Sequence, residues 1–134
     1  MKTAIFACVH SAGRSQMAAA WFNQLADTTQ IRGVAAGTEP GPCVHPVAID
    51  AMAEVGIDLS GARPQLLTDA LVETAVALIT MGCGEKCPTA PPGVIRDDWA
   101  LADPKGRPVA EVRAIRDDIR RRVAAFVQEN GWNR

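Results

Sequence analysis

The stretch Cys8-Val9-His10-Ser11-Ala12-Gly13-Arg14-Ser15, near the start of the 134-residue chain, decides the fold. The apolar run of residues 4–7 before it is typical of a buried strand, and residues 16–22 after it are typical of a helix. A strand that turns through small residues into a helix start points several backbone N–H groups at one place. With the positive end of the helix dipole, these groups form a pocket for a tetrahedral oxyanion.

Three side chains give this oxyanion-binding loop, residues 8–14, its chemistry. Cys8 would lose its proton more readily here, because donors that hold an oxyanion also stabilise a thiolate. Arg14 lies six residues later, so the loop can curl and bring its planar guanidinium over two oxygens of the anion. Ser15 carries a hydroxyl at the helix start, where we expect it to cap the helix and donate to the Cys8 sulfur. Cys8 as a buried core thiol is the alternative.

The rest of the chain alternates between strand and helix patterns. Strands are predicted at 31–35 and 76–81, with a further short strand near 94–95 in the loop-rich stretch 82–107. Helices are predicted from Pro46 to Gly56, from a cap at Thr68 or Asp69 to Glu73, and across the periodic segment 112–126. This alternation predicts an α/β fold with a parallel sheet and right-handed crossovers, whose ligands lie at the carboxyl ends of the strands.

Composition narrows the class of protein. A chain of this length with 48% apolar residues is expected to form one globular domain over residues 1–134. A net charge of −1 and the absence of tyrosine argue against a nucleic-acid partner or an anionic membrane surface. No apolar run approaches the roughly 20 residues that span a bilayer. The N-terminus superficially resembles an export signal, but its apolar segment is short and runs into His10 and Arg14, so we expect a cytoplasmic protein.

Residues Cys8 to Ala18, with the Asp103-Pro104 pair downstream, resemble the low-molecular-weight tyrosine phosphatase fold and, more narrowly, the arsenate reductases built on it. Counterparts extend over nearly the whole chain, at 44–46, 54–58, 80–83 and 113–119. The resemblance implies a three-layer α/β sandwich in which helices flank a four-stranded parallel sheet. Two loop positions depart from the family's usual pattern. Ser11 replaces the asparagine that normally braces the loop, and His10 replaces glycine.

The Asp103-Pro104 dipeptide by itself would indicate only a turn. In the resembling family, the aspartic acid of the corresponding loop, here Trp99 to Pro104, gives a proton to the departing oxygen. Thiolate attack on an oxyanion needs this proton because hydroxide is a poor leaving group. The resemblance therefore implies that Asp103 is the general acid, while we expect Trp99 to pack beneath the loop.

Cys83 and Cys87 distinguish a reductase from a phosphatase. The resemblance implies that Cys8 attacks arsenate, that Cys83 attacks the adduct and releases arsenite, and that Cys87 then moves the disulfide outward to thioredoxin. Because Cys8 and Cys83 both follow parallel strands, we expect them at the same sheet edge. The alternatives are two loop thiols without a role, or half of a zinc site completed by Cys43 and His45, although Cys-x3-Cys is an uncommon zinc spacing.

These observations predict a monomeric arsenate reductase whose own chemistry needs no metal or organic cofactor, with phosphate and sulfate as substrate analogues. A phosphatase for phosphotyrosine or small phosphate esters is the nearest alternative. Lys105 follows the Asp-Pro pair, however, so no aromatic ring is present there to stack on phosphotyrosine. An arsenate–thiol transferase that uses glutathione or mycothiol, and a non-catalytic oxyanion or metal sensor, stay open.

Overall fold

The parallel sheet predicted from the sequence is present in the computed structural model, which describes residues 2–82 and 91–134. In these ranges, four strands form one sheet in the order β2-β1-β3-β4, and each neighbouring pair is parallel. The elements in chain order are β1 (Lys2–Cys8), α1 (Arg14–Leu25), β2 (Ile31–Gly37), α2 (Pro46–Ala53), α3 (Asp69–Glu73), β3 (Ala75–Thr80), β4 (Ile95–Asp98) and α4 (Val109–Glu129).

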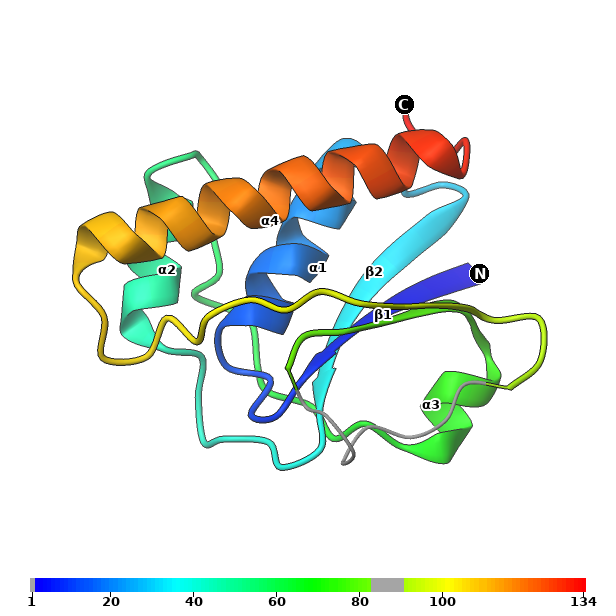
Figure 1. The fold of residues 1–134 in the computed structure, drawn as a ribbon, viewed down its shortest axis with the longest axis horizontal. Helices are drawn as coiled ribbons and strands as arrows, with labels where there is room; N and C mark the ends of the chain where they lie inside the picture. Colours follow the sequence, from blue (N-terminus) through cyan, green and yellow to red (C-terminus); the bar gives the residue numbers. More distant parts are fainter. Residues whose placement is uncertain (1, 83–90) are drawn as a thin grey trace.

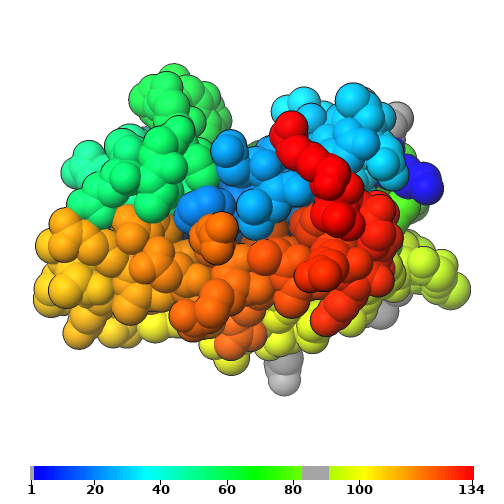
Figure 2. Space-filling model, turned by 90° about the horizontal axis from the view of Figure 1, so that it is seen from above, coloured from blue at the N-terminus to red at the C-terminus, as the bar shows by residue number. Residues whose placement is uncertain are grey.

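Helices cover both faces of the sheet, which gives the three layers (Figure 1). The helices α1, α2 and α4 lie on one face, and the short α3 lies on the other. Seen from above, α4 runs along the length of its face beside α1 and the green residues that follow α2 (Figure 2). None of the helices in the described ranges is long and apolar enough to cross a membrane.

Alternation along β1 divides the core into two apolar clusters. Ala4, Phe6 and Cys8 belong to the cluster under α1 and α4, whereas Ile5 and Ala7 belong to the cluster on the α3 side. Cys8 therefore ends β1 on the face of the sheet that α1 covers. On this face, Phe6 packs against the rings of three residues from other elements, which are Phe22, Trp99 and Phe126. Trp99 is buried, as expected of a residue that packs beneath the Asp-Pro loop.

Most predicted boundaries hold to within a few residues, and the differences have local causes. β2 continues to Gly37 because backbone pairing with β1 extends to the end of that strand. α2 begins at Pro46 as predicted but ends at Ala53, and Gly56, with φ of +81°, lies in the turn beyond it. Thr68 caps α3 by accepting a hydrogen bond from the Leu71 N–H at 3.1 Å.

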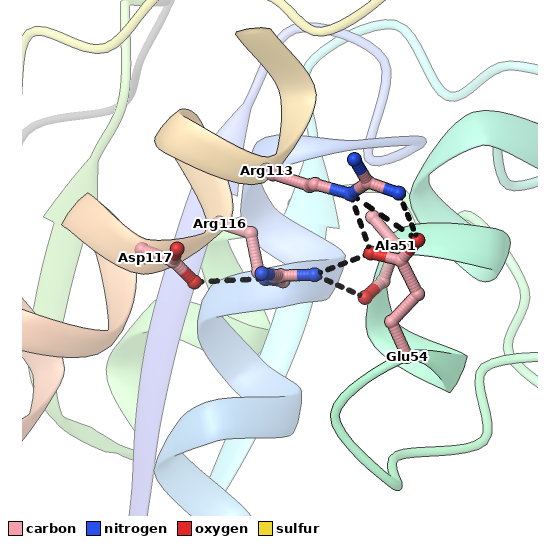
Figure 3. Close-up of polar contacts among 5 residues, drawn as sticks. All are labelled: Ala51, Glu54, Arg113, Arg116 and Asp117. Carbon is pink, nitrogen blue, oxygen red and sulfur yellow. Dashed lines mark hydrogen bonds and ion pairs between the residues drawn. The ribbon is translucent and has the colours of Figure 1, made fainter. Parts of the chain in front are cut away.

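A cluster of charges joins α2 to α4 (Figure 3). Arg113 donates to both carboxylate oxygens of Glu54, at 2.9 and 2.7 Å, and the buried Arg116 donates to the same carboxylate and to the Ala51 carbonyl. Arg116 also pairs with Asp117. The hydrogen bonds from Arg113, followed by that from Arg116, lower the pKa of Glu54 to about 2. This cluster fixes α2, whose first residues lie beside the oxyanion-binding loop, against the longest helix.

Candidate active site

The oxyanion-binding loop connects the last residue of β1, Cys8, to the first residue of α1, Arg14. Ser15 was expected to cap this helix, and that prediction is wrong. The cap residue is Gly13, which makes no side-chain hydrogen bond, and the helix has already begun when the chain reaches Ser15. The Ser15 side chain faces the cysteine, as expected, but the donor is the opposite one from that predicted, since the Cys8 thiol donates to Ser15 Oγ at 3.1 Å. Both side chains are buried.

The carbonyl groups of the loop are bound by donors from outside it. Three of them accept a backbone N–H: the Val9 carbonyl that of Glu39 at 2.8 Å, the His10 carbonyl that of Gly41 at 2.9 Å, and the Ala12 carbonyl that of His45 at 2.8 Å. The Ser11 carbonyl accepts from the side-chain amide of Gln16 at 2.9 Å. No backbone carbonyl among residues 2–82 and 91–134 accepts the N–H groups of residues 10–13. With the carbonyls turned outward, these N–H groups are the donors that an oxyanion in the loop would meet.

Arg14 connects three parts of the site. Its side chain is only 9% exposed, and Nη1 donates to the carbonyl of Leu101, in the Asp-Pro loop, at 3.1 Å. A Cβ placed on Gly82 would lie 2.7 Å from the same nitrogen, so the chain just beyond β3 also passes against the guanidinium. Gly82 has φ of +84°, which favours glycine as well. The structure thus brings the predicted arginine to the Asp-Pro loop and to the residue that precedes Cys83.

The Asp-Pro loop closes onto Gly13. A Cβ on this glycine would lie 2.8 Å from Pro104 Cγ, so the buried proline rests directly on the oxyanion-binding loop. Asp103 is half-buried, and its Oδ1 accepts the Lys105 N–H at 3.0 Å, which makes a local turn. Its carbonyl accepts a hydrogen bond from Arg107 Nε at 2.7 Å. The predicted general acid therefore lies in a turn that contacts the predicted anion site.

A hollow of about 480 Å³ opens beside the loop, between His10, Lys105 and the segment 39–45. His45 is the N-cap residue of α2 and lines this hollow together with the exposed Cys43. Burial lowers the pKa of His45 from its ordinary value of 6.5, and the charge of Asp103 opposes this change. Within the described ranges, no group of three or more His, Cys, Asp or Glu side chains could hold a metal ion.

Two of the predicted site residues, Cys83 and Cys87, lie outside the described residues.

Gln16 is a polar residue that sequence reasoning missed. Its side chain is buried and donates to the Ser11 carbonyl, although it lies beside the apolar Met17 and Ala18 in α1. An amide in the first turn of a helix, directly after a tight loop, is the signal that would have identified it.

The model of the family described as low molecular weight phosphotyrosine protein phosphatase matches residues 3–131. The arsenate reductase of Staphylococcus aureus strain Newman is 36% identical over 129 residues, which cover 93% of this chain and 95% of that protein.

Two solved structures are similar over 96% of this chain, each at 32% sequence identity. A thioredoxin-dependent arsenate reductase of Corynebacterium glutamicum superposes with a TM-score of 0.83, and this chain spans only 61% of that chain's length. An arsenate reductase in the phosphate binding state superposes with a TM-score of 0.82, and 98% of that chain is covered.

Proposed function

The chain belongs to the low-molecular-weight phosphotyrosine protein phosphatase family, and on this premise we propose that it is an arsenate reductase coupled to thioredoxin. The observation that carries the proposal is the loop at Cys8, whose carbonyls are bound from outside while its thiol contacts Ser15. The reductase names of the relatives with the same fold support the choice of arsenate over phosphate esters. We place the enzyme in the cytoplasm as a monomer.

The first step forms a bond between sulfur and arsenic. The loop N–H groups and Arg14 hold arsenate, and the Cys8 thiolate, stabilised by the Ser15 hydroxyl, attacks the arsenic. Asp103 gives its proton to the departing oxygen, which leaves as water. Arsenic is still pentavalent in this adduct. Phosphate would be bound in the same way, because it has the same shape and charge.

The second step transfers two electrons. The Cys83 thiolate attacks the Cys8 sulfur, the sulfur–arsenic bond breaks, and its electron pair stays with arsenic, which leaves as arsenite. The two thiols are thereby oxidised to a disulfide. Cys87 then attacks Cys83 and releases Cys8 as a thiolate, and the dithiol of thioredoxin reduces the resulting Cys83–Cys87 disulfide. A phosphatase would need neither Cys83 nor Cys87.

NADPH consumption in the presence of arsenate, thioredoxin and thioredoxin reductase tests this relay. Cys8→Ser, Cys83→Ser and Cys87→Ser should each reduce turnover to background, since each removes one link in the electron path. Cys43→Ser removes an exposed thiol outside the relay and should keep full turnover. Full turnover by both Cys83→Ser and Cys87→Ser would contradict the relay.

Two further arms separate the alternatives. Hydrolysis of p-nitrophenyl phosphate should be lost in Cys8→Ser but kept in Cys83→Ser and Cys87→Ser, since ester hydrolysis needs only the first thiol. If glutathione or mycothiol alone supports arsenate reduction, the enzyme is an arsenate–thiol transferase. Arsenate binding without turnover under any reductant would identify a sensor.

A further inference from the structure

We propose that Gln16 is a positioning residue, which holds the oxyanion-binding loop in its anion-binding conformation through the carbonyl of Ser11. This inference rests on the proposed function only in that the loop binds an oxyanion. Gln16 is assigned no contact with the substrate. Its contribution is to fix the direction of the peptide groups that do contact it.

Ser11 is the point in the loop that needs support. Its φ is +52°, in the left-handed region, and it is the one non-glycine residue in the described ranges with positive φ. A residue with a Cβ pays a free-energy cost in this conformation, so other contacts must hold it. Ser11 is fully buried, so its backbone groups depend on protein partners for their hydrogen bonds and not on water.

The Gln16 side chain provides the contacts. Its amide nitrogen lies 2.9 Å from the Ser11 carbonyl, 3.3 Å from Ser11 Oγ and 3.1 Å from the carbonyl of Arg63. The side chain is 6% exposed, so these hydrogen bonds lie out of water, where losing a donor leaves a buried acceptor unsatisfied. One neutral amide therefore ties the first turn of α1 to the loop and to the segment around Arg63.

A second set of contacts supports Ser11 from the segment around Gln65 and from the end of β2. The Gln65 N–H donates to Ser11 Oγ at 3.4 Å, and residues 65 and 67 are bonded to Gly37 through its N–H and carbonyl, both at 2.8 Å. A Cβ on Gly37 would lie 2.6 Å from the Val9 carbonyl and 2.7 Å from the Ser11 nitrogen. The end of β2 thus lies against the loop, and residues 63–67 connect it to the Gln16 side chain.

Removing the Gln16 donors has a consequence for anion binding. The Ser11 carbonyl would be left buried without its partner, and the peptide that joins Ser11 to Ala12 would turn to find another donor. Because the carbonyl and the N–H of one peptide point in opposite directions, this rotation carries an N–H away from the bound anion. The loop would then bind oxyanions more weakly and stabilise the Cys8 thiolate less.

The test compares Gln16→Ala with Asn23→Ala. Asn23 is a second side-chain amide on α1, and it exchanges two hydrogen bonds with Gly33 of β2, at 3.0 and 2.7 Å, away from the loop. Both variants lose hydrogen bonds of a side-chain amide, so both should melt at a lower temperature. Only Gln16→Ala should weaken the binding of inorganic phosphate and slow iodoacetamide alkylation at the Cys8 peptide, each by about 10- to 100-fold.

Gln16→Glu keeps the volume of the side chain but replaces both donors with acceptors. It should lose at least as much phosphate affinity as Gln16→Ala at neutral pH, and it serves where the alanine variant does not fold. Alkylation of the exposed Cys43, measured in the same digest, should be unchanged. If Gln16→Ala or Gln16→Glu folds, melts lower and still binds phosphate like wild type, the positioning role is wrong. If phosphate fails to protect Cys8 in wild type, the oxyanion site itself is wrong, and the inference is overturned with it.

Discussion

The two loops that meet at Gly13 are supported in different ways. Each carbonyl of the oxyanion-binding loop from Val9 to Ala12 accepts a hydrogen bond from another segment, and Ser11 is braced by Gln16. The Asp-Pro loop is anchored at its buried ends, Trp99 and Pro104, and between them Arg14 binds the Leu101 carbonyl. Preorganisation is concentrated in the loop that we propose binds the anion, since fixed donors stabilise an anion without reorganising during the reaction. The Asp-Pro loop, which carries the proposed proton donor, is held mainly by packing and by its own turn.

The largest change should come from Asp103→Asn, which alters the Asp-Pro loop alone. Asparagine keeps the oxygen that accepts the Lys105 N–H, so the turn should survive while the proton donor is lost. We expect the turnover number for arsenate to fall by ~10²–10⁴-fold with phosphate affinity nearly unchanged. Steady-state kinetics and calorimetry measure the two quantities.

Asp58→Asn is the matched control for this change, because the Asp58 carboxylate also accepts a backbone N–H, that of Ser60 at 2.8 Å, in an exposed turn elsewhere. Asp58→Asn should change neither the turnover number for arsenate nor the affinity for phosphate. Wild-type turnover in Asp103→Asn would remove Asp103 from the mechanism and leave the Asp-Pro loop a purely structural part.

An intermediate effect is expected from Gly13→Ala, which acts at the contact between the loops. The new methyl would lie 2.8 Å from Pro104 Cγ, and a proline ring cannot swing aside as a flexible side chain can. Displacement of the Asp-Pro loop should reduce turnover by up to about 10²-fold, and phosphate affinity by much less.

The double variant Gly13→Ala/Pro104→Ala tests the cause of this loss. Removing the ring should restore part of the turnover, and the coupling between the two substitutions can be read from a double-mutant cycle. Strictly additive losses would show that the methyl acts on the oxyanion-binding loop itself and not through the contact with Pro104.

The smallest effect on catalysis is expected at the charge cluster between α2 and α4, whose hydrogen bonds join residues that lie outside both loops. Glu54→Gln should lower the melting temperature by a few degrees and leave turnover unchanged, because the carboxylate lies at the surface. The pKa of Glu54 in the folded protein, about 2, is below its ordinary value of 4.5. Its contribution is therefore complete above pH 4.5 and is lost as the pH falls towards 2.

The difference in melting temperature between wild type and Glu54→Gln should accordingly narrow over that pH range, which thermal unfolding at several pH values would reveal. A constant difference down to pH 2 would mean that the carboxylate does not act through its charge. Asp118→Asn is the control, because Asp118 pairs with Arg121 and Arg122 of the same helix, α4. It removes a partly exposed carboxylate without breaking an ion pair between two helices.

Local patterns were enough to predict the parallel sheet and the loop that carries Cys8. The continuous apolar run of β3 and the periodic apolar residues of α4 report directly which faces are buried. The spacing of Cys8 and Arg14 between a strand and a helix likewise depends only on residues that are close in sequence. The contact between Cys8 and Ser15 could be anticipated for the same reason, whereas the helix cap expected from Ser15 is absent.

Side-chain hydrogen bonds to the backbone of distant segments could not be predicted. Gln16 donates to the backbone carbonyl of Arg63, and Arg14 donates to that of Leu101. Because every residue has a backbone carbonyl, the residue type does not reveal which carbonyl will be bound. β4 was expected near residues 94–95, but it runs from Ile95 to Asp98 with every residue exposed. Backbone pairing with β3 holds this strand, so no apolar alternation marks where it ends.

The close approach of Gly82 to Arg14 restricts which residue can follow β3. A methyl group there would lie 2.7 Å from Arg14 Nη1, and the φ of +84° also favours glycine. Because the same nitrogen donates to the Leu101 carbonyl, a side chain at position 82 would displace the guanidinium and strain its hydrogen bond to the Asp-Pro loop. A residue that has no reactive group of its own therefore sets where the positive charge of the proposed anion site can lie.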